Sequence, residues 1–379
     1  MHAPEFSCPN LTAWLNFECR FRCTMKILAP SLILVAFALV SCQKKVPEQP
    51  VKRDWVSAVD ISQFPEISSS QPVFKDLQGS PKNFLDILQE NGVNTVRLRL
   101  WVNPTGTHSG FLEVKNFAQT LKSRGFKIWL SLHYSDTWAD PAHQVTPAAW
   151  QGLPMNALLD SVLGYTQKVV REIDPDYVQI GNEINTGFLH PLGSISNQNN
   201  FLDLLRAGCL AVRQSSNRCQ IIVHYAGIQN ASWFFQQINT VDYDIIGLSF
   251  YPQWHGKSFT ELRSKIQELS SAHHQRILVA ETAYPFTLDW NDWTNNLVGL
   301  SNQLILPDYP ASKDGQKNFV RDLQGAVLAD PKGLGFCYWG AELIAWKGPQ
   351  STTASVWENQ ALFDFDNRAV PALTEFGLD

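Results

Sequence analysis

The sequence contains no long run of basic residues. Its 30 Lys and Arg are outnumbered by 35 Asp and Glu, which leaves a formal net charge of -5. Because binding to nucleic acid relies on clustered positive charge, this balance argues against a nucleic-acid partner. A disordered chain is equally disfavoured, since 44% of the 379 residues are hydrophobic and suffice for a large core.

The motifs of three common enzyme classes are also missing. The stretch "AVDISQFPEI" lacks the glycines that a dinucleotide-binding fold places after its first strand. The stretch "LHYSD" does not have the HExxH spacing of a zinc hydrolase, and there is no GxSxG elbow of a serine hydrolase. The chemistry therefore has to come from other side chains.

Cysteine is scarce after the N-terminal region. Of seven Cys residues, only Cys209, Cys219 and Cys337 follow residue 54, which is not a disulfide framework. Two interpretations of Cys209 and Cys219 stay open. They either pair across a short helix-to-strand turn, as an exported protein permits, or remain two buried free thiols.

Long apolar runs are limited to one, from Ile27 to Val40 in "MKILAPSLILVAFALVSCQKK". This run is too short to span a bilayer comfortably. With the Lys before it and the small residues after it, the run predicts a signal peptide over residues 25–41. The alternative is a buried strand or helix near the N-terminus.

The ending "LVSC" resembles a bacterial lipobox, which implies cleavage before Cys42 and attachment of lipid to its thiol. We interpret residues 1–24 as a misassigned upstream leader, with Met25 as the native start. Residues 42–54 are polar and contain Pro, as expected of a tether. The prediction is an exported protein, lipid-anchored to a bacterial membrane at its periplasmic face or at the cell surface.

Eight short runs rich in β-branched and aromatic residues alternate with amphipathic helical stretches. The helical stretches include "PKNFLDILQENG", "FAQTLKSRG", "ALLDSVLGYTQKVVREI", "FLDLLRAGCLAVRQ", "SFTELRSKIQELSSAHH" and "GQKNFVRDLQGAVLA". The runs are "DWVSAVDIS", "NTVRLRLWV", "FKIWLSLHYS", "DYVQIGNEI", "QIIVHYAG", "YDIIGLSFYP", "RILVAETAYP" and "GLGFCYWG". Apolar strands joined by helical crossovers predict a parallel sheet buried on both faces. Eight such units predict an α/β fold, a (β/α)8 TIM barrel that forms a single catalytic domain over residues 55–379. An open doubly wound sheet is the alternative.

Two glutamates stand at predicted strand ends, Glu183 on the fourth strand and Glu281 on the seventh. A lone Glu there is usually solvated or ion-paired, but strand ends converge in a barrel. A pair facing each other predicts a glycosidase, in which one carboxylic acid protonates the leaving oxygen and one carboxylate attacks. Either Arg97 or Arg99 would hold Glu281 ionised, while Glu183 carries a raised pKa.

The other strand ends supply polar and aromatic side chains to the same place. They are Asp60, Arg97, Arg99, Trp101, His133, Tyr134, Asp136, Asn182, His224, Tyr225, Tyr251, Trp254, Tyr284, Trp339 and Glu342. Asn182 is expected to donate to a sugar hydroxyl. His133 and His224 are either cleft residues or core histidines satisfied by backbone carbonyls, and we assign both to substrate binding.

Several long stretches, in one order, resemble glycoside hydrolase family 53, the endo-β-1,4-galactanases within the clan of four-seven barrel hydrolases. They are "NTVRLRLWVNP", "HYSDTWADP", "VQIGNEIN", "IIGLSFYPQWHG" and "VAETAYP". The resemblance covers most of residues 55–350. It implies that Glu183 is the acid/base and Glu281 the nucleophile of a retaining mechanism.

The resemblance also implies the substrate, a β-1,4-linked galactan of type I arabinogalactan and pectin side chains, cut internally. Residues expected to line sugar subsites, with aromatic rings under sugar faces, are Asp136, Trp138, Tyr251, Trp254 and Trp339. We expect a monomer whose partners are this polysaccharide and, through the lipid, a membrane.

One departure from the family concerns calcium. Some bacterial members carry an acidic, Gly-rich calcium loop after the nucleophile strand, whereas this chain has "TLDWNDWTNN" there. Asp289 and Asp292 are weak calcium candidates, because the Asp/Gly alternation is missing. We expect no required cofactor. Trp290 and Trp293 suggest that the loop packs, or lines a distal subsite.

Two rivals to the galactanase interpretation remain. The first is a β-mannanase or cellulase of the same clan, since the pair of glutamates is shared. The second is a non-catalytic glycan-binding lipoprotein, for which the loss of one glutamate would be expected, although both are present.

Overall fold

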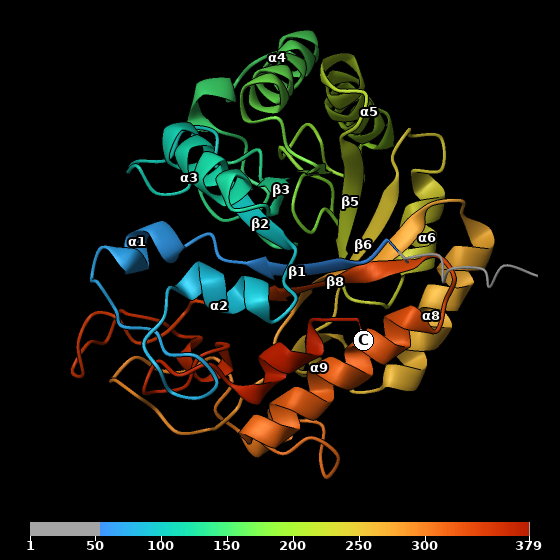
Figure 1. Cartoon of the computed structure of the whole chain (residues 1–379). Helices are drawn as coiled ribbons and strands as arrows, with labels where there is room; N and C mark the ends of the chain where they lie inside the picture. Colours follow the sequence, from blue (N-terminus) through green and yellow to red (C-terminus); the bar gives the residue numbers. More distant parts are fainter. Residues whose placement is uncertain (1–53, 379) are drawn as a thin grey trace, which may run out of the picture. The chain divides into compact units, whose positions relative to one another are not determined.

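The computed structural model describes residues 54–378, in which eight parallel strands form a closed barrel (Figure 1). The strands are β1 (Val56–Asp60), β2 (Thr95–Leu100), β3 (Lys127–Leu132), β4 (Tyr177–Ile180), β5 (Gln220–Ala226), β6 (Ile245–Ser249), β7 (Arg276–Thr282) and β8 (Gly333–Trp339). Strand β1 pairs with both β2 and β8, which closes the barrel. The predicted TIM barrel is therefore confirmed, and the open doubly wound sheet is excluded.

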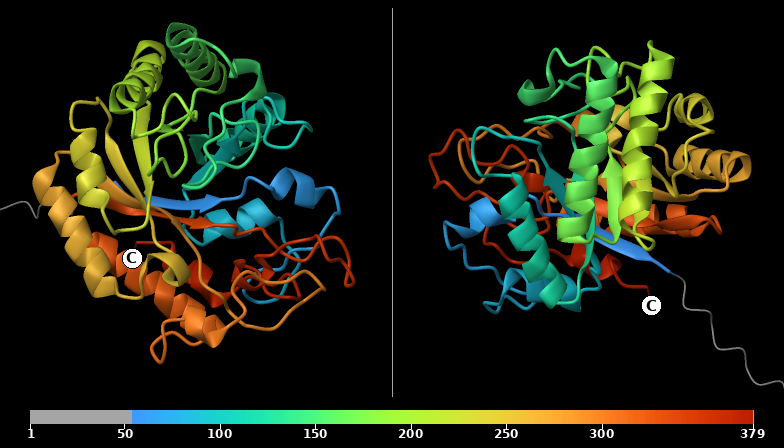
Figure 2. Two further views of the ribbon diagram at one scale, coloured as in Figure 1. Left: turned by 180° about the vertical axis from the view of Figure 1, so that it is seen from behind. Right: turned by 90° about the horizontal axis from the view of Figure 1, so that it is seen from above.

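Helices surround the strands on the outside of the barrel (Figures 1 and 2). They are α1 (Phe64–Ser68), α2 (Phe84–Glu90), α3 (Phe111–Ser123), α4 (Met155–Ile173), α5 (Gln198–Ser215), α6 (Ala231–Gln237), α7 (Pro252–His255), α8 (Phe259–Ala272) and α9 (Lys313–Leu328). Short 3-10 helices span Ala148–Trp150, Ser301–Gln303, Glu358–Gln360 and Pro371–Glu375. The long helices follow from their apolar spacing, as in α4, where Leu158, Val162 and Thr166 are buried one turn apart.

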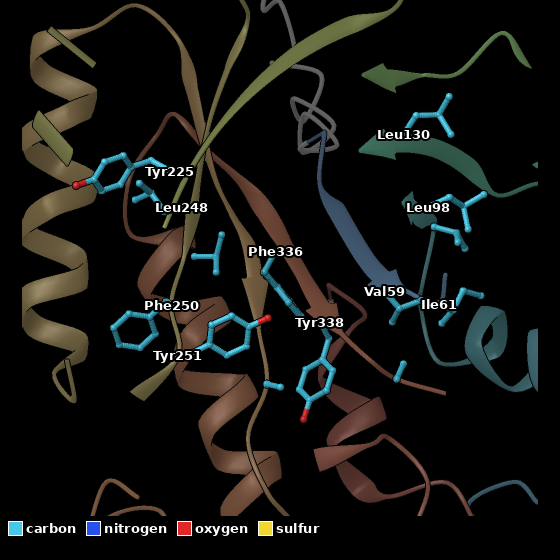
Figure 3. Close-up of a cluster of buried hydrophobic side chains, with 14 of the residues drawn as sticks. Val59, Ile61, Leu98, Leu130, Tyr225, Leu248, Phe250, Tyr251, Phe336 and Tyr338 are labelled. Atoms are coloured by element: carbon cyan, nitrogen blue, oxygen red, sulfur yellow. The ribbon is translucent and has the colours of Figure 1, made fainter. Parts of the chain in front are cut away.

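The core has two parts. The larger one lies between the strands and the helices, and Figure 3 shows some of its side chains, among them Leu98, Leu130 and Phe336. The smaller one draws only on strand residues: Val56, Ala58, Trp129, Tyr177, Ile222, Ile245, Leu278, Ala280, Leu334 and Cys337. A cluster made of strands alone fills the barrel interior.

Polar residues continue the interior toward the carboxyl ends of the strands. Side chains two apart share one face of a strand, so Asp60 lies on the same face of β1 as Val56 and Ala58. Arg97 on β2 is likewise buried, and its guanidinium carbon lies 5.4 Å from the ring of Trp129. The apolar interior thus supports a polar layer at one end of the barrel.

The C-terminal segment packs against the outside of the barrel. Ser57 alternates with the inward-facing Val56 and Ala58, and its hydroxyl donates to the carbonyl oxygen of Phe376 at 2.7 Å. The Phe376 ring is fully buried, with its centroid 5.0 Å from that of Phe336 on β8. The first described residues of the chain lead into β1 at the amino ends of the strands.

Cys209, Cys219 and Cys337 are free and buried, so the disulfide interpretation of Cys209 and Cys219 is not realised. Within residues 54–378, no helix is long and apolar enough to cross a membrane. The leader, the signal peptide, the lipidation site Cys42 and nearly all of the tether lie outside the described residues.

Candidate active site

A cleft of about 520 Å³ opens at the carboxyl ends of the strands and contains both predicted glutamates. Its lining residues are Asp60, Arg97, Arg99, His133, Trp138, Ala139, Asp140, Pro141, Asn182, Glu183, Ala226, Tyr251, Trp254, His255, Glu281, Leu297, Trp339, Val356 and Trp357. Residues from all eight strand ends therefore meet in one place, as the barrel geometry requires.

Glu183 is positioned by a sharp turn directly after β4. Gly181 has a φ of +76°, and a Cβ there would lie 2.4 Å from Cγ2 of Ile184. Glu183 itself has a φ of +47°, a left-handed conformation that costs a non-glycine residue about 1–3 kcal/mol. The Ile184 amide donates to the carbonyl oxygen of His224 on β5 at 3.1 Å, which ties the turn to the barrel. The strained backbone is thus part of a fixed turn.

Glu281 is carried by β7 at a break in the regular pairing. The register with β6 shifts between Leu248 and Ser249, so that Ser249 lies opposite Glu281. The Phe250 amide then donates to the carbonyl oxygen of Glu281 at 2.8 Å. Such irregularities re-aim side chains at the rims of barrels, and here the shift turns Glu281 toward the cleft.

Arg97 is the cation that contacts Glu281. Its Nη2 lies 2.8 Å from Oε1 of Glu281, and its Nη1 lies 2.8 Å from Oδ2 of Asp60. The Tyr251 hydroxyl donates to the other carboxylate oxygen of Glu281 at 3.1 Å. Between the two arginines that the sequence left open, Arg97 holds the seventh-strand carboxylate.

The two carboxyl groups experience different surroundings. Burial, reinforced by the nearby charge of Glu281, raises the pKa of Glu183 to about 8. Burial also raises the pKa of Glu281, but the Arg97 ion pair and the Tyr251 hydrogen bond oppose it. No cation is hydrogen-bonded to Glu183 among the described residues, so Glu281 loses its proton first.

Arg99 has a different role from Arg97. Its guanidinium carbon lies 3.8 Å from the ring centroid of Trp138 and 4.7 Å from that of Trp101. Its Nε donates to Oγ of Ser109 at 3.0 Å. Burial lowers the pKa of Arg99 to about 10. Arg99 therefore supports an aromatic platform at the cleft wall through cation–π contacts.

His133 and His255 are neutral donors in the cleft. The Ala139 amide donates to Nδ1 of His133 at 3.1 Å, and the Tyr251 amide donates to Nδ1 of His255 at 3.1 Å. Burial lowers both pKa values, that of His255 to about 4. Each Nε2 then carries the hydrogen and can donate to a hydroxyl group.

Asn182 directly precedes Glu183, and its side chain makes several hydrogen bonds. Its Oδ1 accepts from Nη2 of Arg97 at 2.8 Å and from Nε2 of Gln179 at 2.9 Å. Its Nδ2 donates to the carbonyl oxygen of Ala139 at 2.8 Å. One amide hydrogen is left for the cleft, which keeps the expected role of Asn182 as a donor to a hydroxyl group.

Four tryptophans form the aromatic wall. Trp138 is 44% exposed and Trp254 is 54% exposed, so both rings present a face to solvent. Trp339 packs edge-on against Trp357 with ring centroids 4.8 Å apart, and Trp254 stacks on Trp357 at 6.4 Å. Exposed rings backed by buried ones are suited to stack on the apolar faces of sugars.

Two expected substrate contacts do not fit the structure. Asp136 does not line the cleft, because its Oδ1 accepts from the Asn103 amide at 2.9 Å and its Oδ2 from the Ala148 amide at 2.8 Å. It joins two loops instead. His224 is fully buried beneath the cleft, where the side chains of Gln179, Asn182 and Ser249, not backbone carbonyls, lie within hydrogen-bond distance of its ring nitrogens.

Three polar or aromatic cleft residues were missed, namely Asp140, His255 and Trp357. None of them ends a strand. Asp140 follows β3 by several residues, His255 ends the four-residue helix α7, and Trp357 belongs to the long segment after β8. The quoted stretches "YSDTWADP" and "YPQWHG" contain the first two, and only that signal pointed to them.

The weak calcium candidates do not act together. Asp289 is exposed and accepts from the Thr287 hydroxyl, whereas Asp292 is buried with one carboxylate oxygen unpaired. The buried Glu358 also leaves one oxygen unpaired. Two carboxylates fall far short of the roughly six to eight oxygen ligands of calcium. Residues 54–378 contain no group of three or more His, Cys, Asp and Glu that could hold a metal.

A parallel barrel with two unequal carboxyl groups among aromatic platforms defines the class of protein, a glycoside hydrolase. The family model of glycosyl hydrolase family 53 matches residues 56–376. The chain belongs to this family.

Similar proteins carry related names. The arabinogalactan endo-beta-1,4-galactanase of Cellvibrio japonicus (strain Ueda107) is 33% identical over 93% of this chain and 97% of that protein. The endo-beta-1,4-galactanase of Bacillus subtilis (strain 168) is 30% identical over 88% of this chain and 87% of that protein. Among solved structures, the Ignisphaera aggregans GH53 catalytic domain matches with a TM-score of 0.80 and 38% identity, over 87% of this chain and 97% of that chain.

Proposed function

We propose that this chain is a retaining endo-β-1,4-galactanase that acts on galactan and on type I arabinogalactan side chains of pectin. The observation that carries the proposal is the inequality of the two cleft glutamates. Glu281 is paired with Arg97 at 2.8 Å, whereas burial raises the pKa of Glu183 to about 8. One group is thus prepared as a nucleophile and the other as an acid.

The reaction proceeds in two displacements. A carboxylate oxygen of Glu281 attacks the anomeric carbon while Glu183 gives its proton to the leaving glycosidic oxygen. The glycosyl-enzyme ester forms, and the leaving chain departs with a new hydroxyl group. Glu183, now ionised, takes a proton from water as the water oxygen attacks the anomeric carbon and frees Glu281. Retaining pairs have their carboxyl groups about 5–5.5 Å apart.

The substrate assignment is supported by the names of similar proteins and by the shape of the cleft. Trp138 and Trp254 offer exposed ring faces for successive sugars, as binding of a polymer requires. The neutral Nε2 donors of His133 and His255 suit hydroxyl groups, which carry no charge.

We also propose export and anchoring by lipid at Cys42, at the periplasmic face of a bacterial membrane or at the cell surface, with the protein acting as a monomer. The support is the order of charged start, apolar run and "LVSC" in the sequence. Anchoring of this kind would keep the enzyme beside polysaccharide fragments that reach the cell.

The experiment that tests the activity offers purified protein β-1,4-galactan, β-mannan and carboxymethylcellulose and measures new reducing ends. Galactan alone should be cleaved, and the first product anomer observed by NMR should be β. Glu183→Gln and Glu281→Gln serve as controls and should remain folded but inactive. Preference for either other polymer would overturn the assignment, and binding of galactan without cleavage would favour the glycan-binding protein.

A further inference from the structure

Two buried side chains, Ser249 and His224, are hydrogen-bonded in series to Glu183 on the side away from the cleft. Oγ of Ser249, at the end of β6, lies 2.5 Å from Oε1 of Glu183 and 2.9 Å from Nε2 of His224 on β5. Both Ser249 and His224 are fully buried. Neither lines the cleft, so neither contacts substrate.

The hydrogens along this chain can be counted. An ionised Glu183 only accepts, so Ser249 must donate its single hydrogen to Oε1. The Ser249 oxygen can then accept from Nε2–H of His224. Nδ1 of His224 is left without a hydrogen and accepts from Nε2 of Gln179, which lies 3.2 Å away. The two hydrogens of Gln179 Nε2 are then shared among Nδ1 of His224, Oδ1 of Asn182 and the carbonyl oxygen of Gly181.

The opposite arrangement fits less well. With the hydrogen on Nδ1, His224 would donate to Oδ1 of Asn182 at 3.1 Å. That oxygen already accepts from Arg97 and Gln179, which fill its two lone pairs. Ser249 would then have to donate to His224, and Oε1 of Glu183 would keep a proton that points away from the substrate.

We propose that Ser249 and His224 are positioning residues, which donate a hydrogen bond to Oε1 of Glu183 and so keep the acid proton on Oε2. The proposal rests on the proposed function, because it presumes that Glu183 is the acid/base. Oε2 is the carboxyl oxygen left free to face the glycosidic bond in the first step and water in the second.

The same hydrogen bond favours the ionised form of Glu183 against burial. Other titratable or charged groups act on this pair from the surrounding strands and loops. They are Glu281 on β7, Arg97 on β2, Asp140 after β3, His133 at the end of β3, Tyr251 after β6 and His255 on α7. None of them takes the place of the Ser249 hydroxyl at Oε1.

Ser249→Ala tests the proposal through the pH profile of the enzyme on galactan. Loss of a hydrogen bond to the ionised carboxylate should move the basic limb of kcat/KM upward by about one pH unit, a tenfold change in the ionisation constant. With an activated aryl galactoside, whose leaving group needs no acid, the second step limits kcat. The acidic limb of kcat on this substrate should move to higher pH as well, because Glu183 must be ionised to act as the base in the second step.

Matched variants separate positioning from packing. Ser249→Thr keeps the hydroxyl group and should restore the original limbs. His224→Leu removes the Nε2 donor and should shift the limbs in the same direction as Ser249→Ala, whereas His224→Gln offers an amide donor and should shift them less. Ser57→Ala removes an equally buried serine on the outer face of β1, where its hydroxyl donates to the carbonyl oxygen of Phe376, and should leave both limbs unchanged.

Unchanged limbs in a folded Ser249→Ala protein would overturn the proposal, and so would an equal shift in Ser57→Ala. If Ser249→Ala does not fold, Ser249→Cys decides, since a thiol is a weak donor of similar size and should give the same upward shift. Failure of the proposed function looks different: Glu183→Gln would then keep its activity on galactan, whatever the Ser249 variants do.

Discussion

At the scale of single residues, Arg97 distinguishes the two glutamates. Its Nη2 contacts Glu281 and Asn182 and its Nη1 contacts Asp60, all at 2.8 Å. Its charge is satisfied mainly by carboxylates, so its own pKa is raised despite complete burial. A buried cation with two carboxylates holds the nucleophile ionised and leaves the acid without a counter-ion.

This arrangement predicts the alkaline limit of activity. Glu183 must be protonated in the first step, and its pKa is raised to about 8. We therefore expect kcat/KM on galactan to be sustained below pH 8 and to fall about tenfold per pH unit above it. The profile should be measured from pH 4 to 10. A basic limb near the ordinary pKa of a glutamate, about 4.3, would contradict the assignment of Glu183 as the acid.

Asn182→Ala should affect both activity and stability. The substitution removes the acceptor of Arg97 and Gln179, and a buried donor without a partner costs about 1–3 kcal/mol. We expect a lower melting temperature by calorimetry together with a lower kcat. Asn103→Ala, in an exposed loop outside the cleft, is the control and should change neither. A lower kcat at an unchanged melting temperature would mean that Asn182 serves substrate alone.

The residues that the sequence could predict are those that end strands. Glu183 and Glu281 were found this way, as were Asp60, His133 and Trp339. Arg97 and Arg99 could not be told apart, because they lie two residues apart on one strand face and differ only in depth within the barrel. Depth depends on the neighbouring strands, which a single run of residues does not reveal.

At the scale of elements, the turn after β4 links backbone conformation to chemistry. Only glycine fits at position 181, both for its φ of +76° and for the close approach of Ile184. Two residues later, Glu183 adopts its own left-handed conformation. The turn therefore directs the acid toward the cleft at the cost of local strain.

Gly181→Ala should be much more harmful than the same change at Gly152. Both glycines have a similar positive φ, +76° and +74°, so both variants bear a strain of about 1–2 kcal/mol. A Cβ at position 152 meets nothing within 4 Å, whereas at 181 it would clash with Ile184 at 2.4 Å. We expect Gly181→Ala to lose an additional 1–3 kcal/mol or so in unfolding free energy and most of its activity. Equal losses in denaturant titrations of both variants would contradict the clash.

The elements that could be predicted are those with a complete periodic pattern. All eight strands and the long helices were found, because an apolar run or several helical turns leave a clear signal. The helices α1, α6 and α7 were missed, since four to seven residues show little of a 3.6-residue period. The equally short α2 was predicted, because an apolar pattern in "FLDIL" follows Asn83, whose side chain caps the helix. Missing α7 meant missing a cleft residue, because α7 places His255 in the cleft.

At the scale of the whole molecule, the two ends of the barrel differ. The carboxyl ends of the strands form the cleft. The described chain begins at the opposite end, since β1 runs from Val56 toward Asp60 and the cleft.

This polarity allows lipid anchoring and catalysis to be separated by experiment. We expect the protein, expressed in a bacterium that processes lipoproteins, to take up labelled palmitate and to enter the detergent phase of Triton X-114. Cys42→Ser should abolish the label and move the protein to the aqueous phase, while kcat and KM on soluble galactan stay unchanged, because the cleft lies at the far end of the barrel. Cys337→Ser, at a buried free thiol in the barrel, is the matched control and should keep the label. Labelling that survives Cys42→Ser would contradict the lipobox, and an unprocessed, unlabelled wild-type protein would contradict export by this signal.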